Sequence, residues 1–338
     1  MIISFRRGQT LNSFFVGLDV GGTHVRIAAY DESTCHISAV GKAAFKKLSG
    51  PEAEVEENVC KRIEAVIRER GRDGKELKGI GISSAAIFDR KSGSIAIWPN
   101  NKMWNGFPLK SYLLKRFMVP VVLEDDANSA ALGEHLAGAG KGYGDFVYIT
   151  ISTGIGCGLI LNNSLYIGSN GWAGEIGHIK VVDDGPECSC GARGCLQSIA
   201  AGPAIRRRFA EIKAFGNHET ISLQEVADLA HKGVSEAKSV FGDAGVYIGK
   251  MVSNLVMLLD VPLVVLGGGV AEAGDVLFGP INSTLNACLN EFGRDVHVKK
   301  CQLGENNGVI GALDLIYRHV NEGNAIKFCK LSKNVGLS

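Results

Sequence analysis

Three consecutive acids stand where an apolar run of the chain gives way to an alanine-rich run. They are Glu124, Asp125 and Asp126, and Ala127 and Asn128 follow them. The apolar run over 119–123 predicts a strand, and the alanine-rich residues after the acids predict a helix. Acids at a helix start are often simple caps, but acids at the carboxyl end of a strand are also well placed to supply a general base for an alcohol. The segment by itself leaves both interpretations open.

Three glycine-rich loops follow apolar runs that are expected to be strands. Glycines let backbone N–H groups approach an anion, so these loops are candidate phosphate cradles. The candidate contacts are Asp19, Gly21, Gly22 and Thr23 in the first loop, Thr153, Gly154 and Gly156 in the second, and Gly267, Gly268 and Gly269 in the third. For the first loop, the alternative is a hairpin turn in which the glycines only supply positive φ. Neither the dinucleotide-binding pattern nor the P-loop pattern is present, so a bound nucleotide needs a different architecture.

One histidine and three cysteines stand close together in the middle of the chain. They are His178, Cys188, Cys190 and Cys195, with the cysteine spacing C-x-C-x4-C. This set matches a tetrahedral Cys3His zinc site, in which four protein ligands leave no open position for catalysis. Buried reduced thiols are the alternative, which the spacing disfavours. The pattern therefore predicts a structural zinc ion that shapes a loop.

Polar side chains beside these motifs are suited to a ligand that carries several hydroxyl groups. Glu175 lies three residues before His178 and can face the same ligand. Asn100 and Trp104, with the apolar pair 97–98, are a further candidate wall, because amide side chains can both donate to and accept from hydroxyl groups. A turn at 99–101 with a packed tryptophan explains that second region equally well.

The composition is that of a globular protein without a strong charge. Of the 338 residues, 46% are hydrophobic and 21% are charged, and the formal net charge is +1. Such a charge gives no electrostatic reason to expect a nucleic acid or an anionic membrane as a partner. No apolar stretch reaches the roughly 18 residues of a membrane span, and clustered cysteines fit a reducing compartment. We therefore expect a cytoplasmic protein that binds small molecules.

Short apolar runs separated by glycines predict an α/β protein whose strands position these loops. Strands are expected over 80–83, 119–123, 146–151, 159–161 and 263–266, and helices over 54–70 and from Ser222, where a capping box begins. The run from Phe15 to Gly22 is similar to the run from Phe146 to Thr153 in its strand-then-turn pattern. The similarity indicates two related halves with facing phosphate loops, although two unrelated hairpins would also produce it.

Together these motifs resemble the ROK family of sugar kinases and related repressors, within the actin-like ATPase superfamily. The resemblance spans residues 15–317 and rests on the three glycine loops, the Glu-Asp-Asp-Ala-Asn segment, and Gly-Glu-Ile-Gly-His with the cysteines that follow it. It implies two actin-like (ribonuclease H-like) α/β domains around an interdomain cleft. The smaller domain would comprise 1–126 and a C-terminal helix near 308–322, the larger one 127–307 with the zinc loop, and 323–338 a tail.

The resemblance implies an ATP-dependent kinase that transfers the γ-phosphate to a hexose hydroxyl, at C6, with glucose as the default substrate. N-acetylmannosamine or another N-acetylhexosamine is the alternative substrate, and a non-catalytic sugar sensor is the alternative class. A homodimer with sugar and ATP as ligands is expected, without nucleic acid or membrane. By resemblance, Asp126 is the catalytic base, the glycine loops hold ATP and Mg²⁺, the His178 cluster holds Zn²⁺, and Asn100, Asp125, Asp126, Glu175, His178 and Gln197 line the sugar site.

Three departures from the family pattern concern the sugar. Asp125 stands where Asn is usual, Ala85 and Ala86 stand where Pro-Gly is common, and Gln197 stands where Glu closes the zinc motif. The small residues resemble the N-acetylmannosamine kinase branch, and an amide in place of a carboxylate predicts weaker and less selective sugar binding. Only 18 residues precede Asp19, too few for the helix-turn-helix domain of the repressor branch, so a kinase is the first hypothesis.

Overall fold

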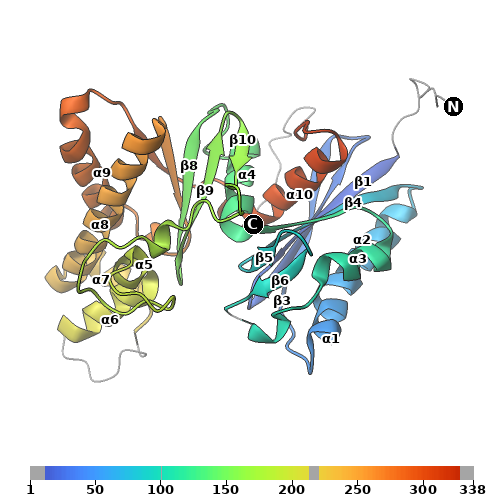
Figure 1. Ribbon diagram of the computed structural model, residues 1–338, viewed down its shortest axis with the longest axis horizontal. Coiled ribbons are helices and arrows are strands. Elements are labelled where there is room, and N and C mark those ends of the chain that lie inside the picture. The colour runs from blue at the N-terminus through green and yellow to red at the C-terminus, as the bar shows by residue number, and fades with distance from the viewer. Residues whose placement is uncertain (1–11, 100, 213–220, 328–338) are drawn as a thin grey trace. The chain divides into compact units, whose positions relative to one another are not determined.

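The computed structural model describes residues 12–99, 101–212 and 221–327. The chain divides into two compact units, one formed by Met1–Leu136 with Asn306–Ser338 and the other by Ala137–Glu305. Each unit combines one five-stranded sheet with helices (Figure 1). The predicted α/β class is confirmed.

The first unit is built on a sheet with the strand order β3-β2-β1-β4-β7. The strands are β1 (Ser13–Val20), β2 (His24–Asp31), β3 (His36–Ala44), β4 (Glu76–Ser84) and β7 (Val121–Asp125). β1 pairs antiparallel with β2 and parallel with β4, and β4 pairs parallel with β7. The carboxyl ends of β1, β4 and β7 therefore lie at one edge of the sheet, so the side chains that end these strands are brought together. A separate hairpin consists of β5 (Ile87–Asp89) and β6 (Ser94–Ile97).

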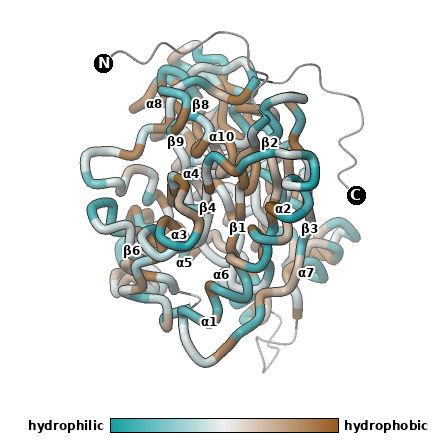
Figure 2. The backbone as a smooth tube through the Cα atoms, turned by 90° about the vertical axis from the view of Figure 1, so that its right-hand side faces the viewer, coloured by the Kyte–Doolittle hydropathy of each residue, from teal (hydrophilic) through white to brown (hydrophobic). Residues whose placement is uncertain are grey.

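Helices cover both faces of this sheet. The apolar side chains of β1 and β4 pack on one face against α2 (Lys61–Gly71) and α3 (Leu109–Phe117). Figure 2 colours the backbone by hydropathy, with hydrophobic residues in brown. The other face carries α10 (Asn307–Val320), which approaches the strands closely at Gly17 and Gly81. The helix predicted over 54–70 is continuous from 51 to 71, with a π-helical turn between α1 (Pro51–Val55) and α2. A 3₁₀ turn (Lys102–Trp104) precedes α3, and another (Gly304–Asn306) precedes α10.

The second unit has the strand order β10-β9-β8-β11-β12. Its strands are β8 (Phe146–Ile151), β9 (Ile155–Leu161), β10 (Ser164–Tyr166), β11 (Leu263–Gly267) and β12 (His297–Lys300). Its helices are α5 (Leu196–Ala200), α6 (Gly202–Ile212), α7 (Leu223–His231), α8 (Ser235–Leu259) and α9 (Asp275–Leu289), with 3₁₀ turns at Ile176–His178, Ala271–Ala273 and Asn290–Phe292. Apolar side chains of α8 and α9 form one core with those of β8 and β11. The capping box predicted at Ser222 is present at the start of α7.

The two sheets have the same topology. In each, three antiparallel strands in sequence order are followed by two parallel strands added at the edge of the first strand. β1 and β8, the two runs whose patterns are similar in the sequence, occupy the same position in their sheets. A duplicated unit explains this better than two unrelated hairpins, because unrelated hairpins would not share the three further strands.

The helix α4 (Asp126–Ala137) belongs to the first unit as far as Leu136. The boundary predicted between 126 and 127 lies at its start. The helix packs against α10 so closely that a Cβ added to Gly311 would lie 1.7 Å from the carbonyl oxygen of Ser129. A Cβ added to Gly133 would likewise lie 2.2 Å from the carbonyl oxygen of Asn307. These contacts join the helix that follows the acids to the sheet that carries them.

Gly81 on β4 should not tolerate a side chain. A Cβ there would lie 1.9 Å from the carbonyl oxygen of Ala312 on α10, and backbone cannot move aside as a flexible side chain can. We expect Gly81→Ala to lower the free energy of unfolding by about 1–3 kcal/mol or more, as overpacked cores do. Urea unfolding measures this, with Gly71→Ala as the control because a Cβ at Gly71 meets open space. An equal stability of the two variants would contradict the tight packing of α10.

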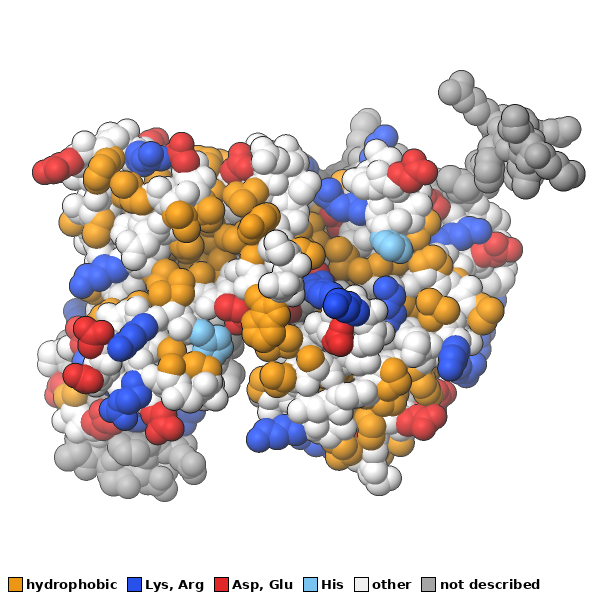
Figure 3. All heavy atoms as spheres, in the orientation of Figure 1, with side chains coloured by type: hydrophobic (Ala, Val, Ile, Leu, Met, Phe, Trp, Pro, Cys, Tyr) orange, Lys and Arg blue, Asp and Glu red, His pale blue; other side chains and the backbone are white. Residues whose placement is uncertain are grey.

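No helix in the described ranges combines the length and the apolar character that crossing a bilayer requires. In Figure 3, Lys and Arg side chains are interspersed with Asp and Glu, which agrees with the near-zero net charge.

Candidate functional site

Asp19 lies one residue before the end of β1 and accepts hydrogen bonds from groups on two other strands. The Arg26 guanidinium on β2 donates to Oδ2 at 3.4 Å, and the Ser83 hydroxyl on β4 donates to Oδ1 at 3.3 Å. A Cβ at Gly308, at the start of α10, would lie 3.2 Å from the Asp19 carboxyl carbon, so a side chain there would crowd the carboxylate. Burial raises the pKa of Asp19 to about 6, against the opposing charge of Arg26, and the charge of Asp126 adds to the increase. A bound cation would be attracted to this site.

The glycines of the first loop are not explained by backbone strain. Neither Gly21 nor Gly22 has a positive φ, although the hairpin alternative required this. The turn is closed by a hydrogen bond from the Gly21 N–H to the His24 carbonyl, and Thr23 is exposed. An ordinary residue can adopt these φ values, so strain does not require the two glycines. A Cβ at Gly21 would lie 3.2 Å from the His24 carbonyl oxygen, so the tight turn accounts in part for that glycine.

The acids after β7 occupy three different environments. Glu124 is buried and receives two hydrogen bonds from Arg90, which follows β5. Asp125 is half-buried and accepts hydrogen bonds from Asn128. Asp126 is exposed at the first position of α4. Asp126 is therefore the most exposed of the three acids.

Glu175 and His178 are held against β9 by the glycines that flank them. A Cβ at Gly174 would lie 2.1 Å from the Cys157 carbonyl oxygen, and one at Gly177 would lie 2.2 Å from the Ile155 carbonyl oxygen. The segment therefore lies flat on the strand that leads out of the second glycine loop. His178 Nε2 lies 3.9 Å from the Glu175 carboxylate, so both exposed side chains can reach one ligand.

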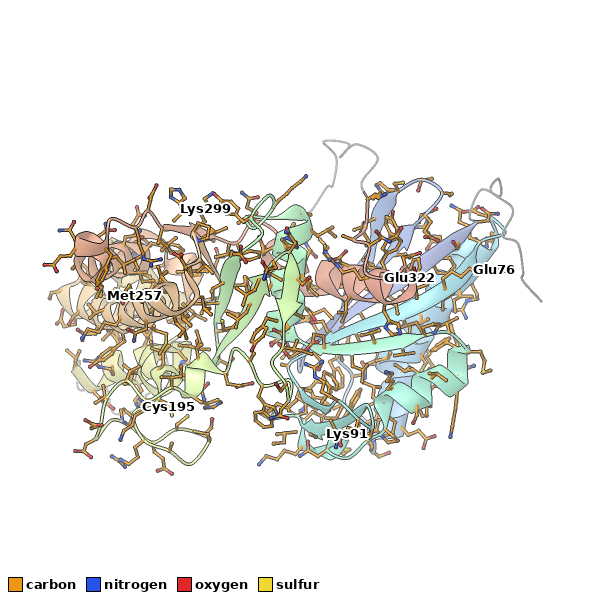
Figure 4. The ribbon with its side chains drawn as sticks, turned by 45° about the horizontal axis from the view of Figure 1, so that its top comes forward. Glu76, Lys91, Cys195, Met257, Lys299 and Glu322 are labelled. Atoms are coloured by element: carbon orange, nitrogen blue, oxygen red, sulfur yellow. The ribbon has the colours of Figure 1, made fainter. Side chains whose placement is uncertain are left out.

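The structure brings His178, Cys188, Cys190 and Cys195 together, with their ligand atoms all within 4.8 Å of one another. His178 Nδ1 lies 3.6 Å from the Cys188 sulfur, and the sulfurs of Cys190 and Cys195 are 3.8 Å apart. Tetrahedral Zn–S and Zn–N bonds of about 2.3 and 2.0 Å imply similar separations between ligands. Figure 4 labels Cys195 at the end of the irregular segment before α5.

The sulfur of Cys188 has the character of a metal ligand. Burial opposes its ionisation, but hydrogen bonds from the Cys190 backbone N–H and the Gln197 amide lower the pKa of Cys188 to about 6. The thiolate is the form that binds a metal. Nδ1 of His178 faces the cysteine sulfurs, and its Nε2 therefore faces the Glu175 carboxylate.

Gln197 contacts the cluster of His178 and three cysteines and also the second glycine loop. Its amide nitrogen donates to the Cys188 sulfur at 3.3 Å and to the Ser189 hydroxyl at 3.2 Å. A Cβ at Gly154 would lie 3.1 Å from its amide oxygen. The sugar contact expected for Gln197 stays a prediction, and the structure adds a hydrogen bond to the Cys188 sulfur that the sequence did not suggest.

The third glycine loop is only partly open to a ligand. A Cβ at Gly267 would lie 2.2 Å from the Tyr148 hydroxyl, and Gly268 has a φ of +83° and lies against the Ile151 carbonyl. Packing alone therefore explains these two glycines. Gly269 is exposed with nothing within 4 Å of an added Cβ, and in the second loop Thr153 is exposed too. Gly156 is half-buried on β9.

The residues expected to form a further sugar wall, Asn100 and Trp104 with the pair 97–98, have different outcomes in the structure. Asn100 itself lies outside the described residues. Trp98 and Trp104 are fully buried and pack edge to face, and Trp104 donates to the buried Glu54 carboxylate at 2.6 Å. The packed-tryptophan alternative is thus correct for Trp104. Ala86, one of the departures from the family pattern, is also buried in this core.

Replacing Gln197 by Glu distinguishes its two contacts. A glutamate cannot donate to the Cys188 sulfur and adds a negative charge beside it, so we expect weaker zinc retention. If Gln197 instead reads sugar hydroxyls, the carboxylate should lower KM by on the order of tenfold, since bonds to charged partners are stronger. Zinc content and sugar KM of Gln197→Glu, measured together, test both. A raised KM at unchanged zinc content would reject both roles and indicate that Asp125 already supplies the charge.

Comparison with known proteins gives a consistent family assignment. The family model described as "ROK family" matches residues 15–319. A glucokinase of Thermotoga maritima is 31% identical over 316 residues, which cover 90% of this chain and 98% of the relative. A Bacillus subtilis xylose repressor is 29% identical and matches 90% of this chain but 77% of its own length. The crystal structure of a ROK family glucokinase from Streptomyces griseus in complex with glucose and AMPPNP is 32% identical, with a TM-score of 0.73 and coverage of 90% of this chain and 99% of that one.

Proposed function

Because the chain belongs to the ROK family, we propose that it is an ATP-dependent sugar kinase with glucose as its substrate. The observation that carries the proposal is an exposed carboxylate, Asp126, at the strand edge where Asp19 also lies. Phosphoryl transfer needs a base for the alcohol, charge neutralisation and in-line positioning, and little covalent chemistry. The T. maritima relative named a glucokinase and the S. griseus glucokinase complex support this substrate class.

The first unit would supply the base and the phosphate loop. We infer that Asp126 accepts the proton of the sugar hydroxyl, at C6 in a hexose. Asp19 would hold Mg²⁺, a hard cation that prefers carboxylate oxygens, and Gly21, Gly22 and Thr23 would approach the phosphates. The half-buried carboxylate of Asp19 and the unstrained glycines support these roles. Asn100 and Asp125 are proposed sugar contacts.

The second unit would supply sugar contacts and adenosine-side contacts. Glu175 and His178 would bind sugar hydroxyls, while Thr153, Gly154, Gly156 and Gly269 would face the nucleotide. Zn²⁺ would be held by Nδ1 of His178 and the three cysteine sulfurs, whose separations suit it. With four protein ligands, its contribution would be to fix the loop, and the chemistry would be left to the side chains.

Coupled release of ADP across glucose, N-acetylglucosamine, N-acetylmannosamine, mannose, fructose and allose tests the proposal. We expect the highest kcat/KM with glucose. A preference for an N-acetylhexosamine would favour the alternative substrate. Sugar binding without ADP release would leave a non-catalytic sensor, a class that the match to a xylose repressor keeps relevant. An exposed general base at Asp126 favours the kinase, because a sensor has no use for one.

A homodimer in the cytoplasm completes the proposal. Light scattering of the purified chain tests the assembly, and fractionation of the source cell tests the location. A monomer in solution or a membrane-associated chain would contradict these two points without affecting the kinase activity.

A further inference from the structure

Glu124, near the end of β7, is paired with a guanidinium. Arg90 donates to the two oxygens of Glu124 at 2.7 and 2.5 Å, and the Glu124 side chain is only 3% exposed. This bidentate pair uses the planar fork of the guanidinium. Within the described ranges, no Lys or Arg donates a hydrogen bond to the Asp125 carboxyl group. The two groups that donate to it are the backbone N–H and the side-chain amide of Asn128.

Asp125 is bound by neutral groups and faced by negative ones. The Asn128 backbone N–H donates to Oδ1 at 2.8 Å, and the Asn128 side-chain amide donates to Oδ2 at 2.5 Å. Charged neighbours come from three places: Glu124 on β7, Asp126 on α4, and the Glu124-bound Arg90 after β5. The register neighbour on β4 is Ser84, a neutral residue. The two acids adjacent to Asp125 in the chain are therefore negative neighbours, while the Arg90 cation is bound to Glu124.

The pKa values of Asp125 and Glu124 are shifted in opposite directions. Burial raises the pKa of Asp125 well above its usual range, and the charges of Glu124 and Asp126 raise it further. Burial opposes ionisation of Glu124 as well, but Arg90 holds the pKa of Glu124 below its ordinary value. The hydrogen bond between the two side chains raises one pKa and lowers the other. This is the pattern of two acids that hold one proton.

We propose that Glu124 and Asp125 hold a single proton at neutral pH, carried by Asp125, so that Asp126 is the only ionised carboxyl group of the three that faces a substrate. Arg90, Glu124 and Asn128 are then positioning residues, because they fix Asp125 as a neutral acid beside the base. A neutral Asp125 does not add to the repulsion of an anionic phosphate. That consequence rests on the proposed kinase function, whereas the protonation itself does not.

The dependence of stability on pH tests the proposal without sugar or ATP. Between the unfolded pKa of about 4 and the folded pKa of Asp125, the native chain holds one proton more than the unfolded chain, so stability falls as pH rises. Asp125→Asn keeps a neutral side chain at all pH values and lacks this loss. We expect the unfolding constant of the wild type, relative to Asp125→Asn, to rise about tenfold per pH unit up to about pH 7.

Urea unfolding of the wild type and of Asp125→Asn, at pH values between about 4 and 7, gives the ratio of their unfolding constants. Asp73→Asn is the control, because it replaces an aspartate by asparagine at an exposed position. A ratio that levels off below about pH 6 overturns the proposal, because Asp125 would then be ionised in the native state at neutral pH. Infrared spectroscopy of the folded protein gives a second reading. The carboxylic acid C=O band at neutral pH should disappear in Asp125→Asn and persist in Asp73→Asn, and a band unchanged in Asp125→Asn overturns the assignment.

Discussion

Asp126→Asn should lose about 10² to 10⁴ in kcat, the usual contribution of a general base, while its affinity for sugar stays close to that of the wild type. The amide preserves the shape of the side chain and its hydrogen bonds to ground-state hydroxyl groups, but it cannot accept the proton of the attacking hydroxyl. Steady-state kinetics on the best sugar of the panel give kcat, and calorimetric titration gives the affinity. The loss should therefore appear in kcat and not in sugar binding.

The neighbouring acids are the natural competitors for this role. Glu124 is fastened by Arg90 and buried, so it cannot reach a hydroxyl group. Asp125 is turned to Asn128 at the start of α4. If Asp126→Asn retained near-normal turnover and Asp125→Asn lost it, the base would be Asp125, and the shared-proton proposal would fail with it.

The sequence predicted the elements and loops that depend on local pattern. Apolar alternation located β4, β8 and β11, and the capping-box spacing located the start of α7. The spacing of one histidine and three cysteines predicted a cluster of four side chains, and the structure brings these four together. Each of these signals acts over a few residues, so the fold has little freedom to override it.

The sequence could not predict contacts between distant strands. Arg90 and Glu124 are 34 positions apart, Ser83 and Asp19 are 64 apart, and neither pair stands in a motif. The parallel pairing of β1 and β4 places Ser83 beside Asp19, and Arg90 reaches Glu124 from the end of β5, which belongs to a separate hairpin. The sequence also suggested ligand contacts at Gly267, Gly268 and Trp104, which have packing roles in the structure. Local sequence does not distinguish a glycine or tryptophan that packs from one that contacts a ligand.

Loss of the cysteine cluster should have the largest effect on the second unit. We expect one zinc ion per chain in protein purified without chelator, and almost none in Cys190→Ser, because three remaining ligands do not complete a tetrahedral site. Glu175 and His178 lie on the segment that this ion would fix, so their release should weaken sugar binding by about 10- to 100-fold, as losses of supporting groups around a metal do. Metal analysis and sugar KM measure the two effects.

Cys288→Ser is the matched control, since Cys288 is an exposed cysteine on α9 that lies outside the cluster. It should keep both the zinc content and the sugar KM of the wild type. The glycines at 174 and 177 hold their segment against β9 whether or not zinc is present. If that packing alone positioned Glu175 and His178, Cys190→Ser would lose zinc and keep its sugar KM, and the ion would be shown to serve only the 185–195 loop. Purified wild-type protein without zinc would remove the metal from the proposal altogether.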